Sequence, residues 1–156
     1  MICRYGPANA PIKTVYQGIK ELLPHTEVIY KKGCDIIDPH FPESEILDFP
    51  KTAEEVQLME EAIRAAKQAE VVVMVLGGNE LTVREDRSRT SLNLPGRQEE
   101  LLKAVCATGK PIILVMLDGR ASSINYAAAH IPAILHAWFP GEFLRTSCGR
   151  SLVRRL

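Results

Sequence analysis

The sequence predicts an α/β fold, a three-layer sandwich in which helices cover both faces of a mainly parallel sheet. Two apolar runs carry this prediction, VVVMVLGG at 71–78 and IILVML at 112–117, and both are typical of strands buried inside a sheet. Amphipathic segments with helical spacing alternate with these runs. Such alternation favours parallel pairing, because each helix returns the chain across one face of the sheet.

The first half of the chain predicts a helix, a short strand, a long loop and a second helix. Apolar residues recur at helical spacing between Pro11 and Pro24, and EVIY at 27–30 indicates a strand. Residues 31–51 contain three prolines and no sustained apolar period, so we expect a loop, and loops of this length often border a site. A capping box at TAEE, residues 52–55, starts the next helix.

The second half predicts two further helix and strand pairs. Pro95 in a first turn and Gly109 at the end bracket one helix. A small-residue stretch at 121–130 is the next helix, and AILHAWF at 133–139 is the last strand. Trp138, at the end of this apolar run, is expected to lie in the core.

The segment 77–96, GGNELTVREDRSRTSLNLPG, is the expected place for chemistry. It follows a buried strand, and ligand sites of open parallel sheets collect at the carboxyl ends of the strands. Three acidic residues alternate in it with three arginines, which by itself indicates a solvated loop with weak ion pairs. A general acid needs a raised pKa, and neighbouring guanidinium groups act in the opposite direction. Any acid catalysis would therefore need drier surroundings from outside this loop.

Five motifs in series resemble the second domain of family 3 glycoside hydrolases. They are VVVMVLGG, REDRSRTSLNLPG, QEELLKAV, TGKPIILVMLDGR and AILHAWFPGE, and the resemblance covers roughly Tyr5 to Glu142. Their serial combination is much more specific than any one of them. The family's β-glucosidases and β-xylosidases are the most similar, and the resemblance implies a flavodoxin-like domain over residues 1–142.

The resemblance also implies roles for single residues. Family members pair an Asp nucleophile from a (β/α)8 barrel with a Glu acid/base on a loop of the second domain. That Glu lies four residues before the Arg of an SRT or DRT element, which places Glu85 in the role and leaves Glu80 as its rival. Asn79, Glu80 and Arg89 are the candidates for substrate binding. The local sequence EDRSRT departs from the common family form EGxDRT, with Asp86 and Arg87 in the place of smaller residues.

The implied reaction is retaining hydrolysis of β-linked glucosides or xylosides through a covalent glycosyl-enzyme. The expected partners are a β-linked glycoside and the barrel, whose pocket would set the sugar preference. No cofactor and no metal are expected. Without the nucleophile no glycosyl-enzyme forms, so we expect this chain alone to be inactive.

Both ends depart from the family pattern. A strand of the VAVIGPNA type precedes this region in the family, whereas only MICRYG stands here, so we expect a first strand to be missing and an open sheet edge to favour self-association. Residues 143–156 hold four arginines and no acidic residue. Codons can be chosen for this segment so that removal of one T after the Phe143 codon shifts the reading frame. The shifted frame reads CGQAVAEALFGDY, which resembles the continuation found in the family. We therefore expect 143–156 to be a frameshifted, non-native tail and the C-terminal part of the domain to be incomplete.

Composition argues against several other classes. Nineteen basic and nineteen acidic residues leave no global field for nucleic acid or an anionic membrane, and no apolar run approaches roughly 20 residues. The four cysteines show no metal-ligand spacing and are expected to be idle thiols; the compartment is not indicated. Two alternatives remain: a Rossmann-like nucleotide-binding module, which GGNEL disfavours because it lacks GxGxxG and GK[ST], and a non-catalytic interaction domain.

Overall fold

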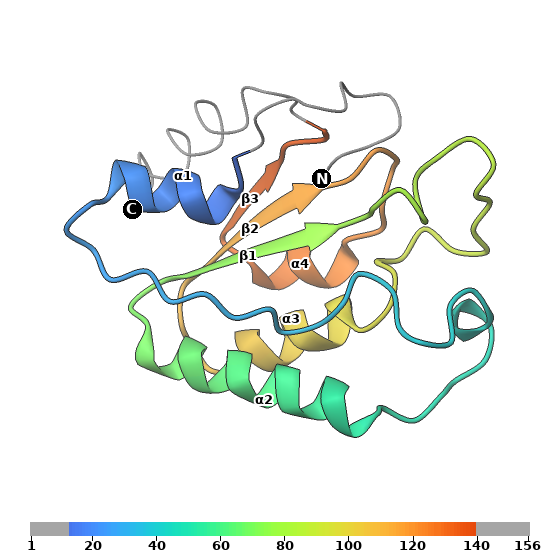
Figure 1. Ribbon diagram of the computed structural model, residues 1–156, viewed down its shortest axis with the longest axis horizontal. Coiled ribbons are helices and arrows are strands. Elements are labelled where there is room, and N and C mark those ends of the chain that lie inside the picture. The colour runs from blue at the N-terminus through green and yellow to red at the C-terminus, as the bar shows by residue number, and fades with distance from the viewer. Residues whose placement is uncertain (1–12, 140–156) are drawn as a thin grey trace.

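The computed structural model describes residues 13–139 as an α/β sandwich (Figure 1). Three parallel strands form one sheet in the order β1-β2-β3, so the predicted fold class is confirmed. The helices in chain order are α1 (Val15–Leu22), the short 3-10 helix η1 (Glu43–Glu45), α2 (Ala53–Gln68), α3 (Gln98–Cys106) and α4 (Asn125–His130). The strands are β1 (Val72–Gly77), β2 (Ile112–Leu117) and β3 (Ala133–His136).

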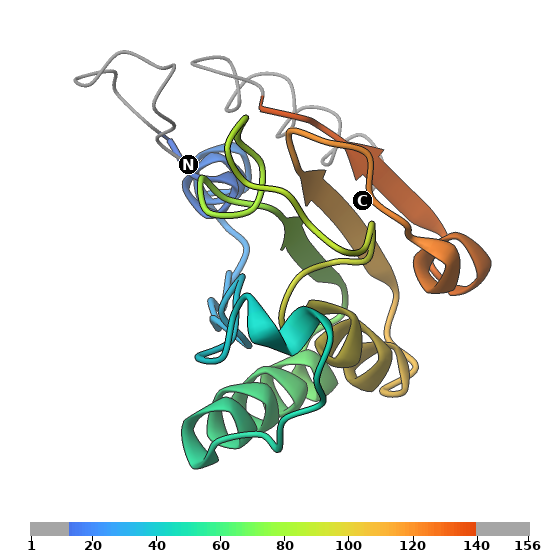
Figure 2. The same ribbon diagram turned by 90° about the vertical axis from the view of Figure 1, so that its right-hand side faces the viewer.

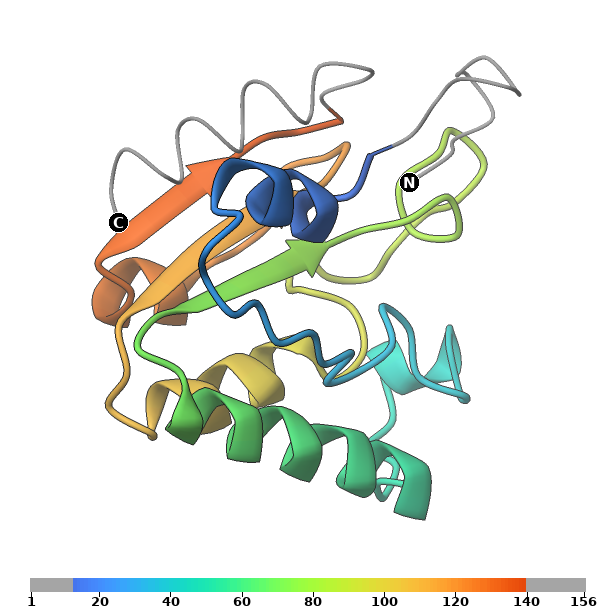
Figure 3. The same cartoon turned by 60° about the vertical axis from the view of Figure 1, so that its left-hand side comes forward.

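The sheet separates two apolar clusters. On one face, Val15 and Ile19 of α1 pack with Ile113 and Val115 of β2. On the other face, α2, α3 and α4 cover the alternate strand residues, among them the fully buried Leu114. Figures 2 and 3 show this layering from two further sides. Because β2 is apolar at every position, it occupies the centre of the three described strands.

Capping explains where the helices α2 and α1 begin. The Thr52 hydroxyl accepts a hydrogen bond from Glu55 N, and the Glu55 carboxylate accepts one from Thr52 N, so the predicted capping box is confirmed. The same reciprocal pair forms between Thr14 and Gln17 and starts α1, whose range lies inside the predicted Pro11 to Pro24 segment.

Two predictions about strands are wrong. Residues 27–30 are not a strand, and no backbone hydrogen bond joins them to β1 within residues 13–139. In a right-handed β-α-β unit that contains α1, the strand partner of this segment would precede α1 in the sequence. Residues 1–12, which precede α1, lie outside the described part. β1 is likewise not buried on both faces: it is the edge of the three-strand sheet, and Val75 is 43% exposed.

The second half differs from the prediction at the boundaries of its elements. α3 starts at Gln98, three residues beyond Pro95. Of the helix predicted at 121–130, only Asn125–His130 is helical, as α4. The strand predicted at 133–139 ends at His136. Trp138, expected in the core, is 54% exposed and has a φ of 53°, a conformation incompatible with a continuing strand. The predicted missing strand, incomplete end and tail at 143–156 lie outside the described residues. Within 13–139, no helix is long and apolar enough to cross a bilayer.

Candidate functional site

The loop predicted to carry chemistry leaves the sheet at the carboxyl end of β1 (Figure 1). Its first residue, Gly77, has a φ of 144° and pairs with Leu117 of β2. An added Cβ would lie 2.0 Å from the Leu117 carbonyl oxygen. Only glycine fits this approach, which lets the chain turn away from the sheet directly at its edge.

The base of the loop is fastened by Gln98, a fully buried amide at the start of α3. Gly77 N–H donates to Gln98 Oε1 at 2.8 Å, and Gln98 Nε2 donates back to Gly77 O at 2.8 Å. The same Nε2 lies 3.0 Å from Pro95 O, at the other end of the loop. One side chain therefore joins the residue where the loop leaves the sheet to Pro95, near the other end of the loop.

Asn79, predicted to bind substrate, is engaged in a local turn. Its Oδ1 accepts from Leu81 N at 2.9 Å, and its backbone N–H donates to Thr82 Oγ1 at 2.9 Å. The Thr82 side chain is fully buried beneath this turn. The bond from Leu81 N to Asn79 Oδ1 defines an Asx turn, and the bond to Thr82 adds to the order at the start of the loop.

The acidic residues of the loop have different surroundings. Arg84 lies between two of them, with Nη1 at 3.5 Å from Glu80 Oε1 and Nε at 2.7 Å from Asp86 Oδ1. Glu85 is exposed, and within residues 13–139 it has no hydrogen-bond or ion-pair partner. Among the three acidic residues, Glu85 is thus the carboxylate that remains available to an external group.

Arg89, the other predicted binding residue, is buried in an ion pair. Its Nε donates to Glu45 Oε1, and the two side chains are only 5% and 7% exposed. Thr90 N donates to Glu45 Oε2 at 3.0 Å. Burial raises the pKa of Glu45, but the hydrogen bonds from Thr90 and Arg89 outweigh it, so the net pKa lies below its ordinary value. Arg89 therefore orders the loop and does not face outward.

The loop is also attached to the segment that follows β2. Arg120 Nη2 donates to Arg87 O at 2.9 Å, and a parallel bridge joins Asn93 to Ser123. Asp118, fully buried at the end of β2, accepts from Arg120 N and Ser122 Oγ and so orders this neighbouring segment. The residues around Glu85 are thereby tethered on several sides.

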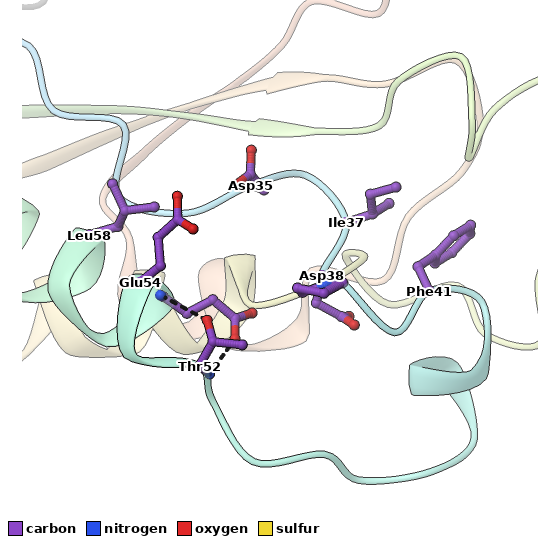
Figure 4. Close-up of a pocket in the computed structure, with 9 residues that line it drawn as sticks. Asp35, Ile37, Asp38, Phe41, Thr52, Glu54 and Leu58 are labelled. Carbon is purple, nitrogen blue, oxygen red and sulfur yellow. Dashed lines mark hydrogen bonds between the residues drawn. The ribbon is translucent and has the colours of Figure 1, made fainter.

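One groove of the described part lies away from this loop. It has a volume of about 380 Å³ and separates segment 35–41 from the first turns of α2, with Asp35 and Glu54 on its two sides (Figure 4). No residue of the 77–96 loop lines it. A smaller groove of about 180 Å³ runs between the two long loops, next to Glu45 and Arg89. Neither groove encloses Glu85, whose carboxylate is open to solvent.

Two structural residues of the site were missed by sequence reasoning. Gln98 had a detectable signal, because it is a polar residue on the buried stripe of Leu101, Leu102 and Val105. Glu45 had none, since its partners lie 44 and 45 residues further along the chain.

Other chemistry is limited in the described part. Burial raises the pKa of the Cys34 thiol to about 11, so this thiol stays protonated near neutral pH, as expected for an idle cysteine. Within residues 13–139, no group of three or more His, Cys, Asp or Glu side chains is placed to hold a metal ion.

The fold and the loop together define an α/β domain that presents, at the carboxyl ends of its strands, a carboxylate with no partner among residues 13–139. The model of the glycosyl hydrolase family 3 C-terminal domain matches residues 4–154. The chain belongs to this family, which confirms the resemblance drawn from its motifs. The match extends into the segment predicted as a non-native tail, and that boundary remains a prediction.

Relatives support the same assignment. The chain is 41% identical over 129 residues to a beta-xylosidase of Formosa agariphila and 35% identical over 146 residues to a periplasmic beta-glucosidase of Salmonella typhimurium. These alignments cover 82% and 87% of this chain but only 16% and 18% of the relatives. The chain therefore spans less than one fifth of the length of either relative.

Solved structures agree on the fold. A β-glucosidase from Erythrobacter marinus matches with a TM-score of 0.75 at 32% identity, over 90% of this chain and 21% of the other. An exo-β-xylosidase of the family matches with a TM-score of 0.76 over 96% of this chain and 17% of the other; at 19% identity it supports the fold alone. The nucleotide-binding alternative is not favoured by any of these findings.

Proposed function

We propose that Glu85 is the general acid/base of a retaining β-glycosidase acting on β-glucosides or β-xylosides. One observation carries the proposal: Glu85 is exposed and unpaired within the described residues, whereas Glu80 and Asp86 share Arg84. A catalytic carboxylate must be free to approach the glycosidic oxygen. The rival Glu80 is the weaker candidate because Arg84 already lies beside it.

The nucleophile would come from a (β/α)8 barrel, which needs about 250 residues and so exceeds this chain of 156 residues. The two carboxyl groups of a retaining glycosidase lie about 5 Å apart. The tethered loop at the carboxyl ends of the strands suits such a neighbour, because it holds Glu85 outside its own domain. The barrel would also supply the dry, anionic surroundings that raise the pKa of a general acid. Asn79, Glu80 and Arg89 would then act mainly by ordering this loop.

Pairing the chain with a barrel tests the proposal. We expect the chain alone to release no aryl alcohol from aryl β-glucoside or β-xyloside, because it offers no nucleophile for the glycosyl-enzyme. A chimera in which residues 13–139, including loop 31–51, replace the matching segment of the Formosa agariphila relative is expected to hydrolyse the same substrates. Steady release by the pure chain that is abolished in Glu85→Gln would contradict the need for a barrel. An inactive chimera that retains the relative's fold would contradict the proposed role of this segment.

We further propose that the chain self-associates through the outer edge of β1. Val72 N–H donates to Pro111 O, just before β2, and Gly78 N–H donates to Leu117 O of β2. The alternate residues Val73, Val75 and Gly77 therefore direct their backbone groups away from β2. Gln98 satisfies Gly77, which leaves Val73 and Val75 without a strand partner within residues 13–139. Unpaired edges of this kind promote pairing with another chain.

Light scattering over a range of concentrations tests this edge. The mass of the parent chain is expected to rise with concentration, and Val75→Lys is expected to suppress the rise because lysine disfavours edge pairing. Leu22→Lys is the control, since Leu22 is similarly exposed on α1. A parent that stays monomeric, or a Leu22→Lys variant that suppresses association equally, would contradict pairing at β1.

A further inference from the structure

The long loop 31–51 runs beside the loop that carries Glu85, and it contacts that loop and the start of α3 at three points. Glu45 binds Arg89 and Thr90, Phe49 O accepts from Arg97 Nη2, and Ile36 O lies 3.3 Å from Gln98 Nε2. Figure 3 shows both loops at the same end of the sheet. These contacts lie at the two ends of the segment 89–98, and the smaller groove lies between them, so loop 31–51 holds this segment at both ends.

Glu45 makes the most concentrated of these contacts. Its Oε1 accepts from Arg89 Nε, and its Oε2 accepts from both Thr90 N at 3.0 Å and Thr90 Oγ1 at 3.2 Å. A single carboxylate therefore holds a guanidinium, a backbone amide and a hydroxyl of two consecutive residues. Both partners of the ion pair are almost completely buried. Separating a buried pair leaves an uncompensated charge, so this arrangement strongly favours one geometry.

We propose that Glu45 is a positioning residue for Glu85. Glu45 binds Arg89, four residues after Glu85, and so fixes the C-terminal side of segment 84–89. The rest of this segment is held by the Arg84 ion pair with Asp86 and by the hydrogen bond from Arg120 to Arg87 O. The inference rests on the proposed role of Glu85. Glu45 would thus set the direction in which the acid/base faces a neighbouring domain, without touching substrate itself.

The mobility of position 85 tests the proposal in the full chain. A nitroxide label is placed at Glu85→Cys after the four native cysteines have been replaced by alanine, and its spectrum is recorded at room temperature. Glu45→Ala is expected to increase the mobile fraction roughly threefold or more, because the turn then opens locally. Val105→Ala is the matched control: it removes buried volume from α3 and leaves both loops untouched. Its label spectrum is expected to equal that of the parent.

Two milder variants keep the test decisive if Glu45→Ala fails to fold. Glu45→Gln keeps an acceptor for Thr90 but loses the charge, and Thr90→Val removes only the hydroxyl contact. Both are expected to give mobile fractions between those of the parent and Glu45→Ala. Unchanged spectra in the folded variants, or equal mobilisation by Val105→Ala, would overturn the positioning role. The label reports motion and not catalysis, so this result is independent of whether Glu85 proves to be the acid/base.

Discussion

In the active chimera, Glu85→Gln is expected to lower the hydrolysis of glycosides with poor leaving groups by about 10²–10⁴-fold, the usual contribution of a general acid/base. Glutamine matches glutamate in size but cannot donate the proton that an alkoxide leaving group needs. An aryl leaving group that departs as a stable anion needs little protonation, so its first step should be much less affected. Azide should then accelerate turnover, because it attacks the glycosyl-enzyme without a general base. The measurements are kcat/KM for both substrate types, which reports the first step, and kcat for the aryl substrate with and without azide, which reports turnover of the glycosyl-enzyme.

Glu80→Gln and Asp86→Asn are the matched controls, because both residues lie on the same loop and both pair with Arg84. Each is expected to cost less than about tenfold, since neither is proposed to transfer a proton. If the large loss followed Glu80→Gln, with azide rescue, the acid/base would be Glu80. Equal losses in all three variants would indicate that the loop acts only as an ordered surface.

Gly77→Ala is expected to destabilise the chain by roughly 3–5 kcal/mol, the combined cost of an unfavourable backbone conformation and an overpacked contact. The new Cβ would meet the Leu117 carbonyl oxygen at 2.0 Å. This oxygen already accepts a hydrogen bond from Gly78 N at 3.0 Å, so moving it away would break the end of the β1 and β2 pairing. Urea unfolding at constant m-value measures the change.

Gly109→Ala separates the two causes. Gly109 also has a positive φ, of 75°, but no atom lies within 4 Å of its added Cβ. Its cost is expected to be about 1 kcal/mol, from backbone strain alone. A Gly77→Ala variant as stable as Gly109→Ala would show that the Leu117 contact relaxes freely.

Much of the fold followed from local patterns. The capping box at Thr52 and the apolar runs at 71–78 and 112–117 identified α2 and the first two strands, because caps and buried strands depend on neighbouring residues. The strand expected at 27–30 failed for a non-local reason, since a strand needs a ladder partner. The prediction that Trp138 lies in the core was wrong because the positive φ of this residue is incompatible with a continuing strand. Its side chain therefore does not extend the buried part of β3.

The sequence by itself determined the family, the alternation of helices and strands, and the loop on which Glu85 lies, because each of these depends on ordered motifs within short segments. Only the tertiary structure decided that Glu80 and Asp86 share Arg84, that Arg89 is buried against Glu45, and that Gln98 fastens both ends of the loop. Carboxylates in one loop are chemically alike in sequence. They become different when arginines and amides distant in the chain are folded beside some of them, which leaves Glu85 exposed and unpaired within the described residues.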